Sequence, residues 1–270
     1  MAPLLVVVFV LSGAAGLIYE SIWSRYLGLF VGHSADAQVI VLVIYLGGMS
    51  LGAALTARVS QRIREPLAAY AGVEIVVGLI GLAFHGVFRG VTGFAYATLF
   101  PALAGGAALV MVKWALAGAL ILPQSILLGS TFPLMSAGLV RRTSRDGATH
   151  SGYALSLLYF ANSIGAAAGV LVAGFYLIER VGLPGTLTAA AVINIGVGLV
   201  VWGAVKLSED RGEVRETREE PQTADASPIS HESAPLSPRP SPPAIHPSLP
   251  FLWRVLLLVS FGTALASFIY

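Results

Sequence analysis

Three charged residues lie inside apolar stretches of the sequence, where they could carry proton or ion chemistry. Glu20 and Arg25 belong to SGAAGLIYESIWSR (12–25), and Glu74 belongs to AYAGVEIVVGLIG. An isolated charge at the centre of a bilayer costs about 2.5–3.5 kcal/mol on insertion scales, so intramembrane acids pair with other groups or serve proton relays. Each acid therefore has two open interpretations: a proton, ion or cationic-solute site, or a buried hydrogen bond that holds helices together.

Glu20 shares a helical face with small residues. Ser12, Gly16 and Glu20 are spaced by four, so they stack on one face, and small residues let a neighbouring helix approach closely. Arg25 follows about 140° around an ideal helix, so the two charges do not stack as an i,i+4 pair. We expect Glu20 to face protein or a water-filled cavity, and either to find a partner on another helix or to be protonated.

Neutral polar residues are further candidates for a solute pathway. Tyr159 and Asn162 are three apart and share a face, and Gln124 follows Pro123, where a broken helix would expose backbone groups able to coordinate an ion. Each could instead form an interhelical hydrogen bond, worth about 0.6 kcal/mol on average. Close helix packing is the expected role of five glycines: Gly16, Gly48, Gly52, Gly165 and Gly169.

Composition identifies the class of protein that must position these residues. The 270-residue chain is 56% hydrophobic and 11% charged, whereas soluble domains carry about 25% charged residues. It is therefore predicted to be an all-α, multi-pass integral membrane protein. There is no cysteine, and His33 and Asp36 lack a third ligand, so we predict no metal site and no cofactor. A net charge of +2 gives no reason to expect a nucleic-acid partner.

Six segments are apolar enough to cross a bilayer, which takes about 20 residues. A kink or break is expected in the fourth, at Pro123 and Pro133. Residues 207–250 are predicted to be a disordered proline-rich linker, in which SEDRGEVRETREE could form a short helix, and residues 251–270 to begin a seventh helix. The predicted helices cover residues 4–30, 37–57, 68–87, 107–139, 153–178 and 186–205.

The distribution of Arg and Lys predicts the orientation. These residues concentrate in the second and fourth loops and behind the sixth helix, which places the N-terminus and the linker in the cytoplasm.

The last apolar segment resembles the first. LLVVVFVLSGAAGLIY (4–19) matches VLLLVSFGTALASFIY (255–270) at five of 16 positions. We therefore expect a second unit to begin there, and two parallel halves joined by a long cytoplasmic loop are the organisation of major-facilitator transporters. The sequence ends where the counterpart of Glu20 would come, so the chain is expected to be half of a larger protein or assembly.

Four segments also point to a family. SGAAGLIYESIWSRYLGLFVG, YLGGMSLGAALTAR, LPQSILLGSTFPLMSAGLVR and YFANSIGAAAGVLVAGFYLI together resemble the fused major-facilitator/spermidine-synthase-like membrane proteins of bacteria. The resemblance covers residues 4–206 and 251–270. It implies a six-helix facilitator-like bundle in the bacterial cytoplasmic membrane, followed by an aminopropyltransferase-like module. The strand, Gly-rich loop and helix of such a module do not occur in this sequence, so no enzyme activity is expected of it.

Two functions are consistent with these features. The chain could be the transporter-like half of a facilitator-type protein that moves a small polar or cationic, polyamine-like solute. It could instead be a membrane anchor or interaction subunit that transports nothing and docks a spermidine-synthase-like module or a larger membrane complex. The expected partners are the lipid bilayer and a second transmembrane half or partner membrane subunit.

Overall fold

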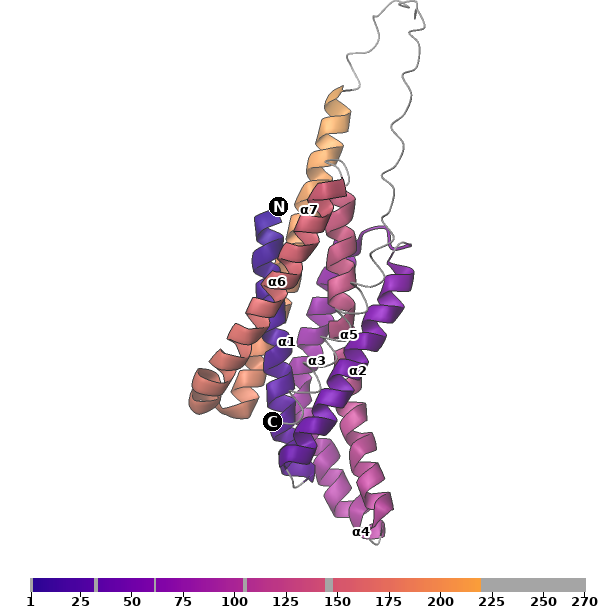
Figure 1. Ribbon diagram of the computed structural model, residues 1–270, viewed down its shortest axis with the longest axis vertical. Helices are drawn as coiled ribbons and strands as arrows, with labels where there is room; N and C mark the ends of the chain where they lie inside the picture. The colour runs from indigo at the N-terminus through magenta and orange to yellow at the C-terminus, as the bar shows by residue number, and fades with distance from the viewer. Residues whose placement is uncertain (1, 32–33, 61, 104–105, 144–147, 220–270) are drawn as a thin grey trace, which may run out of the picture. The chain divides into compact units, whose positions relative to one another are not determined.

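Helices account for nearly all of the structure. The computed structural model describes residues 2–31, 34–60, 62–103, 106–143 and 148–219, and no strand occurs among them (Figure 1). The predicted linker beyond 219, the seventh helix and His33 lie outside these residues. The helices are α1 (Ala2–Val31), α2 (Ser34–Val59), α3 (Pro66–Phe94), α4 (Phe100–Ala102), α5 (Ala107–Thr143), α6 (Ala148–Val172) and α7 (Ile178–Glu219), with π-helical segments η1 (Ala95–Leu99) and η2 (Ala173–Leu177).

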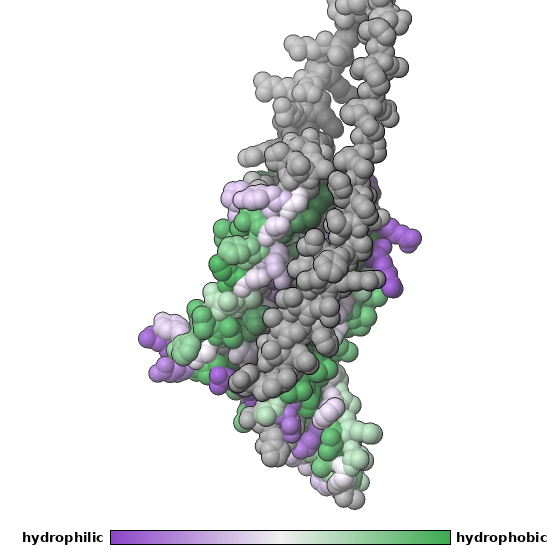
Figure 2. All heavy atoms as spheres, in the orientation of Figure 1, coloured by the Kyte–Doolittle hydropathy of each residue, from purple (hydrophilic) through white to green (hydrophobic). Residues whose placement is uncertain are grey.

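Five continuous helical stretches are long and apolar enough to cross a membrane. The expected class, an all-helical multi-pass membrane protein, is thereby confirmed. Figure 2 shows the same property at the surface, where hydrophobic side chains cover the visible flanks of the helices and hydrophilic ones gather near the connections. The stretches are Pro3–Phe30, Ala35–Val59, Pro66–Ala102, Ala107–Arg142 and Gly152–Ser208.

The fifth stretch folds back on itself. Its 57 residues would extend about 85 Å as one straight helix, far more than the roughly 30 Å of a hydrocarbon core. Gly182 interrupts the helix with φ 68° and ψ −176°, a conformation that glycine adopts without the steric cost of a Cβ. Figure 1 shows α6 and α7 running in opposite directions on either side of this reversal.

Connections with basic residues lie at one end of the helices. In Figure 1 the N-terminus, the α2–α3 connection and the C-terminal end of α5 lie toward the top, whereas the α1–α2 connection, α4 and the α6–α7 reversal lie toward the bottom. Arg141, near the end of α5, donates hydrogen bonds to the carbonyl oxygens of Ile63 at 2.6 Å and Arg64 at 2.8 Å. The two basic segments are therefore directly linked.

Three helix ends or interiors differ from prediction. The third helix does not end near residue 87 but continues through η1 to Ala102. This extension is held by Tyr96, whose ring packs edge-on against Phe30 with centroids 6.0 Å apart and whose hydroxyl donates a hydrogen bond to the main-chain carbonyl oxygen of Phe30. No break occurs at Pro123 and Pro133, and the expected kink there stays a prediction. α5 remains helical through both, and neighbouring helices and Ser/Thr side chains stabilise membrane helices that contain proline.

The predicted boundary between helix and linker is also too early. α7 continues beyond residue 206 to Glu219. The charged sequence SEDRGEVRETRE continues the helix that precedes it.

Helix α1 packs most closely against α6 through reciprocal glycine contacts. A Cβ added to Gly13 would collide with the carbonyl oxygen of Asn162, and a Cβ added to Gly165 would collide with that of Val10. Each glycine lies three residues after the residue whose carbonyl faces the opposite glycine. The two helices therefore touch backbone to backbone.

The same arrangement recurs between α2 and α5, another closely packed pair. A Cβ on Gly129 would collide with the carbonyl oxygen of Met49, and a Cβ on Gly52 would collide with that of Ile126. The three-residue spacing on each helix is that of the α1–α6 contact. Exchanging α1 with α5 and α6 with α2 thus reproduces the contact.

The contact between helices α3 and α7 is unchanged when these two helices are exchanged with each other. A Cβ on Gly78 would lie 2.7 Å from the carbonyl oxygen of Ala191, and a Cβ on Gly198 would lie 2.7 Å from that of Ala71. The helical unit α1–α3 is therefore repeated by α5–α7, with a local two-fold axis that passes through the α3–α7 contact.

Candidate functional site

A groove of about 650 Å³ between α1, α2 and α6 contains two of the charged residues singled out in the sequence. Glu20 is half-buried in it and Arg25 is exposed in it. The groove is lined by Glu20, Ser21, Ser24, Arg25, Gly28, Leu29, Gln38 and Val170.

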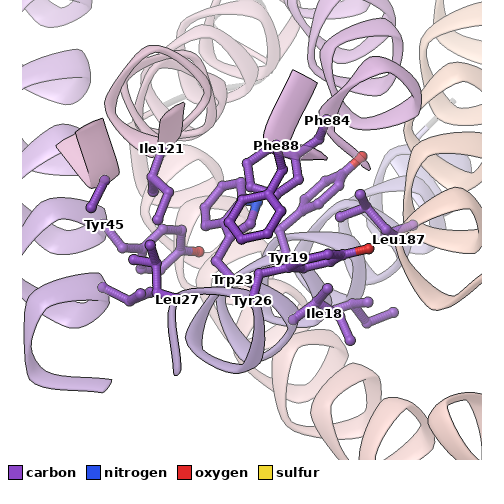
Figure 3. Close-up of a cluster of buried hydrophobic side chains, with 14 of the residues drawn as sticks. Ile18, Tyr19, Trp23, Tyr26, Leu27, Tyr45, Phe84, Phe88, Ile121 and Leu187 are labelled. Carbon is purple, nitrogen blue, oxygen red and sulfur yellow. The ribbon is translucent and has the colours of Figure 1, made fainter. Parts of the chain in front are cut away.

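An aromatic cluster on the opposite side of α1 orients these charges. Tyr19 and Trp23 are fully buried and stacked, with ring centroids 5.6 Å apart. Tyr26 packs edge-on against Phe88, at 4.8 Å between centroids. Figure 3 shows these rings gathered with Phe84 in one hydrophobic cluster. The polar residues between the aromatic positions line the groove: Glu20, Ser21, Ser24 and Arg25.

Neither groove charge is neutralised by a side chain in the described part of the chain. Glu20 and Arg25 do not form an ion pair, and five helical positions separate them by about 7.5 Å along the axis. The hydrogen bond recorded at Glu20 uses its main chain, where Ser24 Oγ donates to the carbonyl oxygen at 3.0 Å. Glu20 therefore faces the groove, without a partner on another helix among the described residues.

Glu74 lies in a different environment, at the α1–α3–α7 contact. Its side chain is 0% exposed. Ser12 Oγ donates to Oε1 at 2.5 Å, and Asn194 Nδ2 donates to Oε2 at 2.8 Å. Both oxygens are thus engaged by neutral donors, which is the arrangement of a hydrogen bond between helices. Glu74 and Asn194 also occupy equivalent positions of the repeated unit, so this bond spans the local two-fold axis.

Sequence reasoning did not identify Asn194 as a site residue. The signal was available, since an asparagine inside the apolar segment AAAVINIGVG is a polar group that needs a partner in the membrane. Ser12 was placed on the face of Gly16 and Glu20. In the structure these three residues have separate surroundings: Ser12 contacts Glu74, Gly16 lies beside the Tyr45 hydroxyl, and Glu20 lines the groove.

The two acids lie at different levels of α1. Ser12, the partner of Glu74 on α1, precedes Glu20 by about 12 Å along the helix axis. The aromatic residues of α1 fill the interior beside Glu20. The groove and the Glu74 cluster are therefore separate sites.

The neutral candidates lie outside the groove. Gln124 is buried and its Nε2 donates to the carbonyl oxygen of Val77 at 3.1 Å, linking α5 to α3. Tyr159 is 66% exposed and packs edge-on against Phe132. Asn162 faces Gly13 in the α1–α6 contact. None of the three lines the groove that contains Glu20.

Four of the five glycines expected to pack helices lie at two helix contacts. Gly48 and Gly52 lie against α5, and Gly165 and Gly169 lie against α1. Gly16 is less crowded, since a Cβ there would meet the Tyr45 hydroxyl at 3.4 Å.

No cluster of three or more His, Asp or Glu side chains that could hold a metal ion occurs in the residues that the structure describes. Comparison of the chain with models of protein families, with curated proteins and with solved structures finds no match.

Proposed function

We propose that this chain is the transporter-like half of a facilitator-type membrane protein, and that the groove at Glu20 and Arg25 is part of its solute pathway. In this proposal α6 and α7 are counted as separate crossings on either side of Gly182, so the bundle has six. Support comes from the repeat of α1–α3 by α5–α7, because two inverted units of three helices make up each half of a facilitator transporter.

The observation that carries the proposal is a pair of unneutralised charges in one groove at membrane depth. α1 has 30 residues and is about 45 Å long, and Glu20 lies about 27 Å from its start. A hydrocarbon layer of about 30 Å centred on this helix would include Glu20. A charge at that depth is unfavourable against lipid, and charged groups in membrane helices face the protein interior or water. The groove is therefore proposed to hold water and solute, with its open side covered by a second bundle.

The proposed orientation has the N-terminus and the basic connections in the cytoplasm of a bacterium. The basic α2–α3 connection and the C-terminal end of α5 lie at the same end of the helices as the N-terminus (Figure 1), and Arg141 binds the carbonyl oxygen of Arg64 there. Positively charged connections remain on the cytoplasmic side during insertion. The groove then lies toward the outer side of the membrane.

Uptake in proteoliposomes tests the proposal. The full chain is reconstituted at a density at which two copies can assemble, because the open side of the groove needs a second bundle. A panel of labelled small polar solutes is offered, including diamines, amino acids and dicarboxylates. We expect uptake of at least one class by the wild type and its loss in Glu20→Gln. The matched control is Arg89→Gln, which removes a charge from an exposed position of α3 outside the groove.

Two outcomes would contradict the proposal in different ways. Unchanged uptake by Glu20→Gln with a lower unfolding temperature would assign Glu20 a structural role. Absence of uptake of every solute by folded wild-type protein that has assembled with a second bundle would contradict transport and favour a membrane anchor or interaction subunit.

A further inference from the structure

We infer that the groove binds a zwitterionic solute, one that carries an ammonium group and a carboxylate separated by several bonds. This inference rests on the proposed function and names its substrate class. It differs from the cationic, polyamine-like solute that the family resemblance suggests.

The charges of the groove are balanced. Glu20 is the acid and Arg25 is the base among its lining residues. A carboxylate accepts charge-assisted hydrogen bonds from an ammonium group, and a guanidinium group binds a carboxylate in a two-pronged geometry. Because the two side chains are not paired with each other, each can engage an opposite charge on the same solute.

The spacing of Glu20 and Arg25 along α1 determines how far apart the two charges of the solute must be. The two Cα atoms of an ideal helix at this separation are about 9 Å apart. A solute that reaches both side chains at hydrogen-bond distance needs a chain of several bonds between its charges. The neutral groups of Ser21, Ser24 and Gln38 line the same groove and can bind polar atoms along that chain.

A diamine fits this groove less well. One ammonium group could bind Glu20, but the second would lie near the positive charge of Arg25. Like charges in a partly desolvated groove repel more strongly than they do in water. Glu74, the acid of α3, accepts hydrogen bonds from Ser12 and Asn194 and does not line the groove.

A matched series of five-carbon compounds tests the inference by binding, independently of transport. The full chain is purified in lipid nanodiscs, and its unfolding midpoint is measured with 5-aminopentanoate, 1,5-diaminopentane or pentanedioate at equal concentration and ionic strength. Ligands that bind the folded state raise the midpoint. We expect a clear upward shift with 5-aminopentanoate and little or none with the other two compounds.

Variants then assign the recognition of each charge. Arg25→Gln should lose the response to 5-aminopentanoate and gain preference for 1,5-diaminopentane, whereas Glu20→Gln should favour pentanedioate. Arg89→Gln should keep the wild-type preference. The midpoint without ligand shows whether each variant is folded.

The wild-type series alone is decisive if a variant does not fold. A shift with the diamine alone would overturn the zwitterion inference while leaving a cation transporter possible. A shift with the dicarboxylate alone, or with none of the three compounds, would also overturn it. Failure of the transport assay with a retained zwitterion shift would instead contradict only the proposed function.

Discussion

The hydrogen-bonded contact at Glu74 yields a prediction that separates structural from functional roles. Glu74→Leu removes the acceptor for Ser12 Oγ and Asn194 Nδ2 and leaves both donors buried. Glu74→Gln keeps an acceptor for Ser12. Its new amide can donate to Asn194 Oδ1, which has no partner among the described residues, after the Asn194 amide rotates.

The expected loss in the free energy of unfolding follows from the number of hydrogen bonds removed. Interhelical hydrogen bonds in membrane proteins average about 0.6 kcal/mol and reach about 1.7 kcal/mol, and an unsatisfied buried group costs about 1–3 kcal/mol in soluble proteins. Loss of two bonds should therefore lower the free energy of unfolding of Glu74→Leu by about 1–3 kcal/mol. Glu74→Gln should lower it by less than about 1 kcal/mol.

Asn194→Leu provides the second arm of a double-mutant cycle. In the Glu74→Leu/Asn194→Leu protein one of the stranded donors is gone, so its destabilisation should be smaller than the sum of the two single effects, by about 0.5–1.5 kcal/mol. The measurement is unfolding of the purified chain in mixed micelles, followed by tryptophan fluorescence. Glu74→Gln should also retain uptake in proteoliposomes.

Two results would refute this reasoning. Additive effects of the two leucine substitutions would show that the bond across the two-fold axis contributes nothing. Loss of uptake in a stable Glu74→Gln protein would show that the carboxyl group acts in transport and does not merely join helices.

Three further predictions concern packing, the basic connection and orientation. Gly52→Ala should destabilise the chain by about 1–3 kcal/mol because its Cβ meets the α5 backbone. At the control position, Gly47→Ala, the Cβ meets nothing within 4 Å, so this change should be neutral or stabilising by up to about 1 kcal/mol. Equal shifts of the unfolding midpoint in the two variants would contradict the close contact between α2 and α5. Arg141→Ala should accelerate amide hydrogen exchange in the α2–α3 connection, whose carbonyl oxygens it binds, and unchanged exchange would assign that arginine no anchoring role. Because the chain lacks cysteine, Arg62→Cys should react with an impermeant thiol reagent only from the cytoplasmic side and Ala107→Cys only from the outside; labelling of both from one side would contradict the proposed crossings.

Several features of the fold were predictable because membrane helices are specified by local composition. Length and hydropathy alone indicated an all-helical chain, since helices satisfy every backbone hydrogen bond within one segment. The extent of α3 was not predictable. Its last turns contain poor helix formers, and they are held by Tyr96 and Phe100 packing on Phe30, a contact between distant segments. Likewise, the continuity of α5 through Pro123 and Pro133 depends on the helices beside it.

For the candidate site, too, the sequence predicted some features and the tertiary structure decided others. The sequence alone determined that Glu20, Arg25 and Glu74 lie in apolar helices and need an explanation, because the cost of a charge in hydrocarbon does not depend on the fold. Only the tertiary structure decided that Glu74 is held by Ser12 and Asn194 while Glu20 and Arg25 share an open groove. The partners of a buried polar group come from other helices, and their rotation and crossing are set by packing over the whole bundle, which no local pattern records.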